Sequence, residues 1–243
     1  MHSPRNAQII AALIASSFLF GTPFRTANAQ TGTTKPQDRP KAAETAQKTP
    51  AAANQKPDYS TEAVVIDQLT TAYRYESDGT GQRELIMRIK IQSDAGVERF
   101  GQLIFPYSSA NEKLEMDYVR VRKADGSVVN ATPADIQDLS APLAREAPIY
   151  TDLRQKHITV PGLRPGDQLE YRLVWTIHSP LAQNHFWVEH DFVTRGPIVL
   201  SDELTVNIPA TSKVKLKTEP GFDPAIKEEN GRRIYSWKQA VET

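Results

Sequence analysis

The stretch Gln168–Ile177 (QLEYRLVWTI) decides the fold class, because apolar and polar residues alternate along it. One set of alternate positions is large and apolar: Leu169, Tyr171, Leu173 and Trp175. The positions between them are largely polar: Glu170, Arg172 and Thr176. Because successive side chains of a strand point to opposite faces, the stretch predicts a β-strand with one buried face and one face in water.

The same alternation recurs in shorter runs on both sides of this stretch. The further strands expected are 63–69, 72–76, 83–91, 99–107, 114–123, 127–130, 156–160, 185–193, 198–208, 214–218 and 232–237. Turn sequences such as Asp125-Gly126 and Asn230-Gly231 separate these runs, since such pairs tolerate positive φ. This pattern predicts an all-β fold, an antiparallel β-sandwich with at most one short helix. The helix is expected after Thr132, which can cap it.

The N-terminus has the three parts of a secretory signal peptide, which we assign to residues 1–29. A basic head containing Arg5 precedes an apolar run at 9–20, and Ala27-Asn28-Ala29 supplies the small-x-small pattern before the cleavage point. The run is shorter than the roughly twenty apolar residues that a membrane-spanning helix needs. We therefore expect an exported protein, periplasmic or secreted, with no stable membrane span; a buried core helix is the alternative.

Residues 30–58 differ in composition from the rest of the chain. They are rich in Pro, Ala, Thr, Gln and Lys and contain no aromatic or branched aliphatic residue. Such a segment cannot bury enough apolar surface to offset the entropy of ordering it, so we expect a disordered linker. A tether that spans the cell wall is the more specific alternative. Residues 59–243 are then expected to form the β-sandwich domain.

The composition excludes several classes of protein. The chain contains 29 basic and 29 acidic residues, which argues against a nucleic-acid binder. It contains no cysteine, which excludes disulfides, a thiolate nucleophile, Cys-ligated zinc and a lipid-carrying cysteine. An exported protein of this length without cysteine suits a bacterial periplasm better than a eukaryotic secretory route.

The sequence contains no convincing catalytic or metal site. The segment 185–191 (HFWVEHD) holds two histidines and two carboxylates, but on a strand His185 and His190 would point in opposite directions. Neither a nucleophile elbow nor a phosphate-binding glycine loop is present. We therefore assign no catalytic residue, no cofactor-binding residue, no cofactor and no metal ligand, and we expect no enzymatic activity from this chain alone.

A candidate interaction surface comprises Asp152, Arg154, His157 and Trp187. The first three crowd polar groups between a loop and a strand, and Trp187 could stack on a sugar or a peptide. The alternatives are structural: Asp152 and Arg154 could form an ion pair that braces the loop, and Trp187 could fill the core. Four tyrosines share the second ambiguity: Tyr73, Tyr75, Tyr107 and Tyr150.

The order of several short motifs is more specific than any one of them. They are VRVRKADGSVV at 119–129, YTDLR at 150–154, ITVPGL at 158–163, PGD at 165–167, Glu170-Tyr171, Ser179-Pro180, the aromatic-rich 185–192, Pro197 and VNIP at 206–209. In this order they resemble the uncharacterised β-rich domain that precedes a transglutaminase-like domain in many exported bacterial proteins. The resemblance spans about 64–237.

The resemblance implies an accessory domain beside a papain-like enzyme with a Cys-His-Asp triad. That enzyme would lie after Thr243 or on another chain, and the abrupt end of this chain favours a longer reading frame. With no cysteine here, the triad maps onto no residue of this sequence. We therefore expect an exported, non-catalytic accessory domain. The alternatives are an independent module that binds carbohydrate or peptide of the cell envelope, and an enzyme whose site the sequence does not reveal.

Overall fold

The computed structural model describes residues 57–146, 152–193 and 196–240. The predicted signal peptide, nearly all of the predicted linker and Tyr150 lie outside these residues. The described residues form twelve strands and little helix, which confirms the all-β class. They include no helix that is long and apolar enough to cross a membrane.

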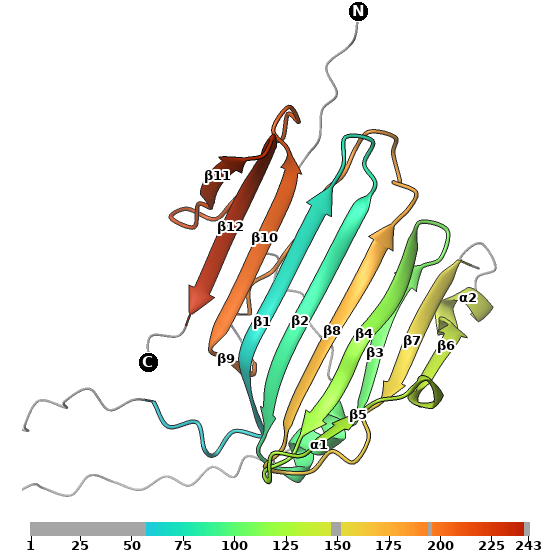
Figure 1. Ribbon diagram of the computed structural model, residues 1–243, viewed down its shortest axis with the longest axis vertical. Coiled ribbons are helices and arrows are strands. Elements are labelled where there is room, and N and C mark those ends of the chain that lie inside the picture. The colour runs from blue at the N-terminus through green and yellow to red at the C-terminus, as the bar shows by residue number, and fades with distance from the viewer. Residues whose placement is uncertain (1–56, 147–151, 194–195, 241–243) are drawn as a thin grey trace, which may run out of the picture. The chain divides into compact units, whose positions relative to one another are not determined.

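A nine-stranded sheet is the main element of the fold (Figure 1). Its strand order is β11-β12-β10-β1-β2-β8-β4-β5, and β9 pairs with β1 beside this path. The strands are β1 (Val64–Tyr75), β2 (Gly81–Ile91), β4 (Glu112–Arg122), β5 (Val128–Asn130), β8 (Gln168–Ile177), β9 (Ile198–Val199), β10 (Ser201–Pro209), β11 (Ala225–Glu229) and β12 (Arg232–Ala240). The pairing is antiparallel except that β1 runs parallel to both β10 and β9. The sheet is therefore mixed, where an antiparallel one was expected.

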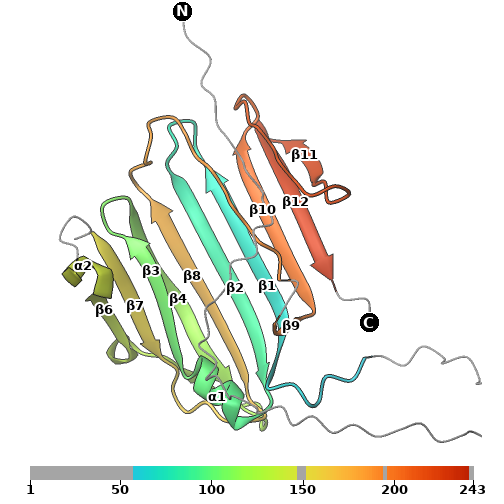
Figure 2. The same cartoon turned by 180° about the vertical axis from the view of Figure 1, so that it is seen from behind.

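A second sheet of three strands lies on the β4 side of the large sheet, away from β11 (Figure 2). Its order is β3-β7-β6, with bounds Gln102–Ser108, Leu153–Thr159 and Ile136–Ser140. The small sheet packs on the large one through a shared core, in which Phe105 contacts Tyr171 and Trp175 edge to face. The core takes the apolar positions of QLEYRLVWTI, so the alternation predicted from sequence is the one observed: Leu169, Tyr171, Leu173 and Trp175 are buried.

The other half of the same face is covered by chain without regular secondary structure. The segment 185–193, expected as a strand, is an irregular stretch that crosses this face on its way to β9 (Figure 2). Its Phe186, Val188 and Phe192 are buried against residues of β1, β10 and β12. Residues 214–218, also expected as a strand, are likewise irregular. In 185–193 the alternation marks packing against a sheet rather than pairing within one, whereas in 214–218 Val214 packs on the core and Leu216 is exposed.

Two short α-helices are present, α1 (Asp94–Phe100) and α2 (Pro142–Glu146), one more than expected. The helix predicted after Thr132 is a single 3₁₀ turn at Pro133–Asp135, where the Thr132 N–H and hydroxyl both donate to the Asp135 carboxylate. Helix α1 displaces the start of the strand expected at 99–107. It fits there because Gly96 packs on the Ala63 carbonyl, where any Cβ would clash at 2.5 Å.

The uncovered face of the large sheet carries charged side chains in pairs. Glu170, although nearly buried, lies among three arginines: its carboxylate is 2.6 Å from Arg120, 3.2 Å from Arg88 and 3.9 Å from Arg122. Beside it, Arg172 pairs with both Glu84 and Asp117. Two polar residues of QLEYRLVWTI, Glu170 and Arg172, thus form ion pairs with residues of both neighbouring strands, β2 and β4.

The turn between β7 and β8 (residues 160–167, the motif turn) contains the sequence motifs PGL and PGD, and Asp167 stabilises it. Its buried carboxylate accepts hydrogen bonds from the Lys123 ammonium at 2.7 Å and from the Arg164 N–H at 2.8 Å. Gly162 and Gly166 take positive φ in the same turn, at 62° and 91°. The residues Gly162, Gly166 and Asp167 of the sequence motifs therefore stabilise the turn and connect it to Lys123.

Candidate functional site

A pocket of about 430 Å³ opens between the two pieces that cover the large sheet. One side is the end of the small sheet, at Ser108 and Asp152, and the other is the chain that follows β8, from Ser179 to Glu189. The floor is the large sheet itself. The pocket exists because the small sheet and the irregular segment 185–193 meet the same face without closing over its end.

The floor carries charge on an otherwise apolar face. By strand register, Arg83 of β2 lies beside Tyr73 of β1 and Trp175 of β8, so its side chain emerges on the covered face. Its guanidinium carbon lies 3.9 Å from the centroid of the Trp175 ring, a cation–π contact. Glu112 of β4 lies at the same end, pairs with Ile177 of β8 and also lines the pocket.

An aromatic stack forms one wall. The rings of Tyr75 and Phe186 are 4.4 Å apart and nearly parallel, and Tyr73 stacks on the far side of Tyr75 at 6.0 Å. The Tyr75 hydroxyl donates to the Trp187 carbonyl at 3.2 Å. Burial raises the pKa of Tyr75 well above its ordinary value, so the phenol keeps the proton that it donates. The indole of Trp187 is 49% exposed at the mouth of the pocket.

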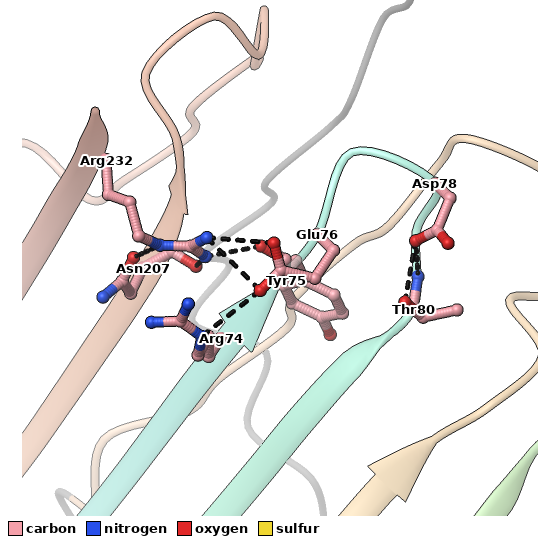
Figure 3. Close-up of polar contacts among 7 residues, drawn as sticks. All are labelled: Arg74, Tyr75, Glu76, Asp78, Thr80, Asn207 and Arg232. Carbon is pink, nitrogen blue, oxygen red and sulfur yellow. Dashed lines mark hydrogen bonds and ion pairs between the residues drawn. The ribbon is translucent and has the colours of Figure 1, made fainter. Parts of the chain in front are cut away.

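The turn of the β1–β2 hairpin contacts the chain just before Phe186 and Trp187, at Asn184 and His185. The Asp78 carbonyl accepts the Asn184 N–H at 2.9 Å, and a Cβ on Gly79 would lie 2.4 Å from the His185 carbonyl oxygen. Within the turn, Asp78 accepts the backbone N–H and the hydroxyl of Thr80 (Figure 3). Gly79 has a φ of 90°, so both conformation and close approach require glycine.

Arg232 of β12 anchors the end of β1 beside the hairpin (Figure 3). Its guanidinium donates to the Tyr75 carbonyl at 2.6 Å and to the Glu76 carboxylate at 3.0 Å, and it also bonds Asn207 of β10. Glu76 further pairs with Arg74 at 3.2 Å. Arg232 therefore reaches across β10, where it bonds Asn207, and holds the backbone that carries the Tyr75 ring.

Of the four predicted surface residues, the structure brings two to the pocket, Asp152 and Trp187. Arg154 is bound elsewhere: it donates to the Asp138 carboxylate at 2.8 Å, which also accepts from Lys156 and Tyr107. Within the described residues Arg154 forms its ion pair with Asp138, not with Asp152 as the structural alternative proposed. The Asp152 carboxylate instead accepts a hydrogen bond from Ser108 Oγ.

His157 lies on the opposite face of the small sheet from Arg154, since the two positions differ by an odd number along β7. Its Nε2 contacts the Gln155 side chain at 3.1 Å. The pairing of β7 also places it beside Ile104 and Gln137, away from the pocket. The four residues predicted as one surface thus divide among a pocket, an inward ion cluster and an outer sheet face.

Two charged pocket residues were missed from sequence, Arg83 and Glu112, and a third, Glu189, was considered only as a metal ligand within the segment 185–191. A signal for the first two was present. Arg83 continues the apolar positions Leu85 and Met87 by one step of two, and Glu112 does the same for Leu114 on β4. In this domain, a charged residue at the last position of an alternating apolar series therefore coincides with the pocket at the end of the covered sheet.

The pocket also holds a serine, an aspartate and a histidine, but they do not form a catalytic triad. Ser108 donates directly to Asp152, and His185 Nδ1 lies 2.7 Å from the Gln183 carbonyl oxygen. No hydrogen bond between Ser108 and His185 occurs in the described part of the chain, whereas a nucleophile needs such a contact with its base. No group of three or more His, Cys, Asp or Glu side chains suited to a metal ion is found there either.

Comparison with solved structures shows the fold in a larger protein. A candidate protease from Parabacteroides distasonis ATCC 8503 superposes with a TM-score of 0.58 at 13% sequence identity. The match covers 73% of this chain and 35% of that one, so this chain spans about a third of the length of the solved protein that it resembles. At this identity the likeness shows the fold alone.

Two further structures align less well. An M1 zinc metallopeptidase from Deinococcus radiodurans gives a TM-score of 0.38 at 13% identity, covering 74% of this chain and 39% of that one. A family 3a carbohydrate-binding module from the cipA scaffolding of Clostridium thermocellum gives 0.27 at 10% identity, covering 47% and 76%. Neither value supports an argument about fold or function. No curated protein matches the chain.

A family model covers most of the β domain. It is described as a domain of unknown function with a solved structure, DUF3857, and it matches residues 77–240. The matched range runs from the β1–β2 hairpin to the end of β12 and includes the motif turn with Asp167 and the aromatic segment with Trp187. The predicted resemblance to a β-rich domain of unknown function is confirmed, while the link to transglutaminase-like domains stays a prediction. The chain belongs to the DUF3857 family.

Proposed function

We propose that this protein is an exported, non-catalytic accessory domain that binds a ligand of the cell envelope and presents it to a catalytic domain. The catalytic partner would be transglutaminase-like, located downstream or on a separate chain. Export to the periplasm or beyond follows from the expected signal peptide at residues 1–29. The absence of any cysteine requires that a Cys-His-Asp site be supplied by that partner.

The single observation that carries the proposal is the pocket itself. It is concave, its volume is in the range of small-molecule sites, and it combines an aromatic wall with a few converging polar groups. Its mouth holds Trp187, a large apolar side chain left half exposed. A ligand that stacked on the indole would bury surface that the isolated domain leaves in water.

The likeness in fold to part of a longer candidate protease, of which the match covers 35%, supports the accessory role in a general way. It is the reason for proposing that this domain works as one part of a longer polypeptide. The alternative is that the domain acts alone as a carbohydrate- or peptide-binding module. The exposed Trp187 favours ligand binding under both hypotheses. They differ in that an accessory domain requires a catalytic partner, whereas an independent binding module does not.

Tryptophan fluorescence of the full chain offers a direct test. The chain has three tryptophans, and Trp175 and Trp237 are both buried, so acrylamide quenching reports mainly on Trp187. We expect soluble peptidoglycan fragments or envelope oligosaccharides to protect Trp187 from quenching, and Trp187→Ala to abolish their retention. Lack of protection by any envelope fragment would contradict the proposal.

The non-catalytic part of the proposal needs a separate measurement. We expect the full chain to show no amide hydrolysis and no acyl transfer on the same fragments. Turnover that co-purifies with the chain and disappears in Asp152→Asn would identify an enzyme instead. Matched assays after adding a transglutaminase-like domain from the same reading frame or genome would show whether binding raises its activity.

A further inference from the structure

We propose that the pocket binds the primary ammonium group of a peptide. This inference rests on the proposed function and names the class of ligand for the same site. Four charged side chains line the pocket: the carboxylates of Glu112, Asp152 and Glu189 and the guanidinium of Arg83. The pocket thus has an excess of negative charge, although the whole chain has a net charge of zero.

Two of the three carboxylates form no ion pair or side-chain hydrogen bond in the described part of the chain. Within residues 57–146, 152–193 and 196–240, neither Glu112 nor Glu189 takes part in an ion pair or a side-chain hydrogen bond. Two other carboxylates on the large sheet are paired, Glu84 with Arg172 and Glu203 with Lys238. Like charges gathered in one pocket repel one another, and a bound cation removes that repulsion.

The one cation of the pocket is already engaged. Arg83 lies flat over the Trp175 ring, a position in which its charge interacts with the ring face. It can serve the carbonyl or carboxylate of a ligand, but its single positive charge does not balance the three carboxylates. A neutral sugar would supply hydroxyl groups and no positive charge, whereas an ammonium group donates three hydrogen bonds and carries the charge that the carboxylates lack.

The aromatic wall suits the same ligand. Tyr73 and the half-exposed Trp187 line the same pocket as the carboxylates, while Tyr75 and Phe186 are buried and stack on one another behind this surface. Aromatic faces attract cations, and they also accept the methylene groups that precede a side-chain amine. Carboxylates and exposed aromatic side chains around one pocket suit an ammonium group on an apolar stem, as in a lysine side chain or a similar diamino acid.

Isothermal titration of the full chain with two matched peptides tests this proposal. The probes are acetyl-alanyl-lysyl-alanine amide and the same peptide with its side-chain amine acetylated. We expect the free amine to bind and acetylation to weaken it by about tenfold or more, the size expected for losing a charge-assisted contact. Affinity should also fall as salt is raised from about 50 mM to about 500 mM, since the site is open to water.

Variants locate the interaction. Glu112→Gln with Glu189→Gln should remove the preference for the free amine without lowering the melting temperature, because the two changes also relieve the repulsion between the carboxylates. Glu115→Gln is the control, because Glu115 is an exposed carboxylate that pairs with Lys113 on the open face of the same strand. Equal affinity for both peptides, or an unchanged preference in the double variant, would overturn the proposal.

A glucosamine oligomer and its N-acetylated form separate this inference from the function on which it rests. Binding of the N-acetylated oligomer that depends on Trp187, together with no binding of the lysine peptide, would contradict the ammonium site and leave the binding role in place. Preference for the glucosamine oligomer over the lysine peptide would also contradict a peptide ligand. If neither peptide nor oligomer protects Trp187, both the inference and the proposed function fail.

Discussion

The ring of Phe186 stacks on the ring of Tyr75, with 4.4 Å between centroids and 10° between ring planes. Tyr75 is the last residue of β1, and Phe186 belongs to the irregular chain after β8. The pair joins the large sheet to the segment that covers it, and the same two rings form a wall of the pocket. This one contact therefore contributes both to the stability of this half of the domain and to the shape of the pocket.

Replacing Phe186 by Ala should destabilise the domain strongly. Phe186 is 5% exposed, and truncation of a buried phenylalanine costs about 3–5 kcal/mol from lost burial and the cavity left behind. Trp187→Ala is the matched control. Trp187 follows Phe186 directly but is 49% exposed, so its truncation should change the free energy of unfolding by less than about 1 kcal/mol. Urea unfolding of both variants measures the difference. Similar costs would show that segment 185–193 is not packed as described.

Gly79→Ala should cost more than an equivalent change at another glycine of positive φ. A Cβ at Gly79 would meet the His185 carbonyl oxygen at 2.4 Å, whereas a Cβ at Gly126, with a φ of 86°, meets nothing within 4 Å. Gly126→Ala therefore isolates the backbone strain, about 1–2 kcal/mol. The clash at Gly79 should add about 1–3 kcal/mol and should change acrylamide quenching of Trp187. Equal unfolding free energies would rule out this close approach.

Glu170→Gln should destabilise the open face of the large sheet. The change leaves three arginines facing one another around a nearly buried position. Removing one partner of a fully buried ion pair costs about 3–5 kcal/mol, and the exposure of these arginines, 36–46%, lowers our expectation to about 2 kcal/mol. Glu115→Gln, at an exposed pair on the same face, should cost less than about 0.5 kcal/mol. A Glu170 cost as small as that of Glu115 would contradict the ion cluster.

The cluster around Asp138 should make stability depend on pH in the acid range. Burial by itself raises the pKa of Asp138. Hydrogen bonds from Lys156, Tyr107 and Arg154 together lower the pKa by more than burial raises it, so the pKa lies below its ordinary value. A folded pKa below the unfolded one stabilises the protein above the ordinary pKa of about 4, and this contribution is lost as the pH falls through the folded pKa.

Melting temperatures of the wild type and Asp138→Asn between about pH 6 and pH 2 test this sign. We expect the variant to melt lower at pH 6, and the gap to close as the pH falls, because both proteins then lack the charge. A gap that stays constant, or widens in acid, would contradict a lowered pKa. Arg154→Lys is a useful companion, because it keeps the positive charge and removes the fork geometry that reaches both the carboxylate and the backbone carbonyl of Asp138.

The failures of sequence-based reasoning share one cause. The alternation at 185–193 correctly marks Phe186 and Val188 as buried, but it does not reveal that they pack on a sheet instead of pairing within one. Likewise, the motif YTDLR places Asp152 and Arg154 two residues apart, yet their partners, Ser108 and Asp138, come from different strands. Alternation states which side of the chain is buried, and it carries no information about the distant segment that buries it.

The sequence by itself determined the all-β class, most of the strands with their buried faces, and the tight turns. These are local properties: the side-chain period of two selects the buried face of QLEYRLVWTI, and Asp125-Gly126 and Asn230-Gly231 form turns because Gly126, Asn230 and Gly231 accept positive φ. Only the tertiary structure decided the parallel pairing of β1 with β10, the irregular cover over β1 and the pocket at its edge. Each of those features requires residues far apart in the chain to meet, and the choice among such partners depends on packing of the whole domain.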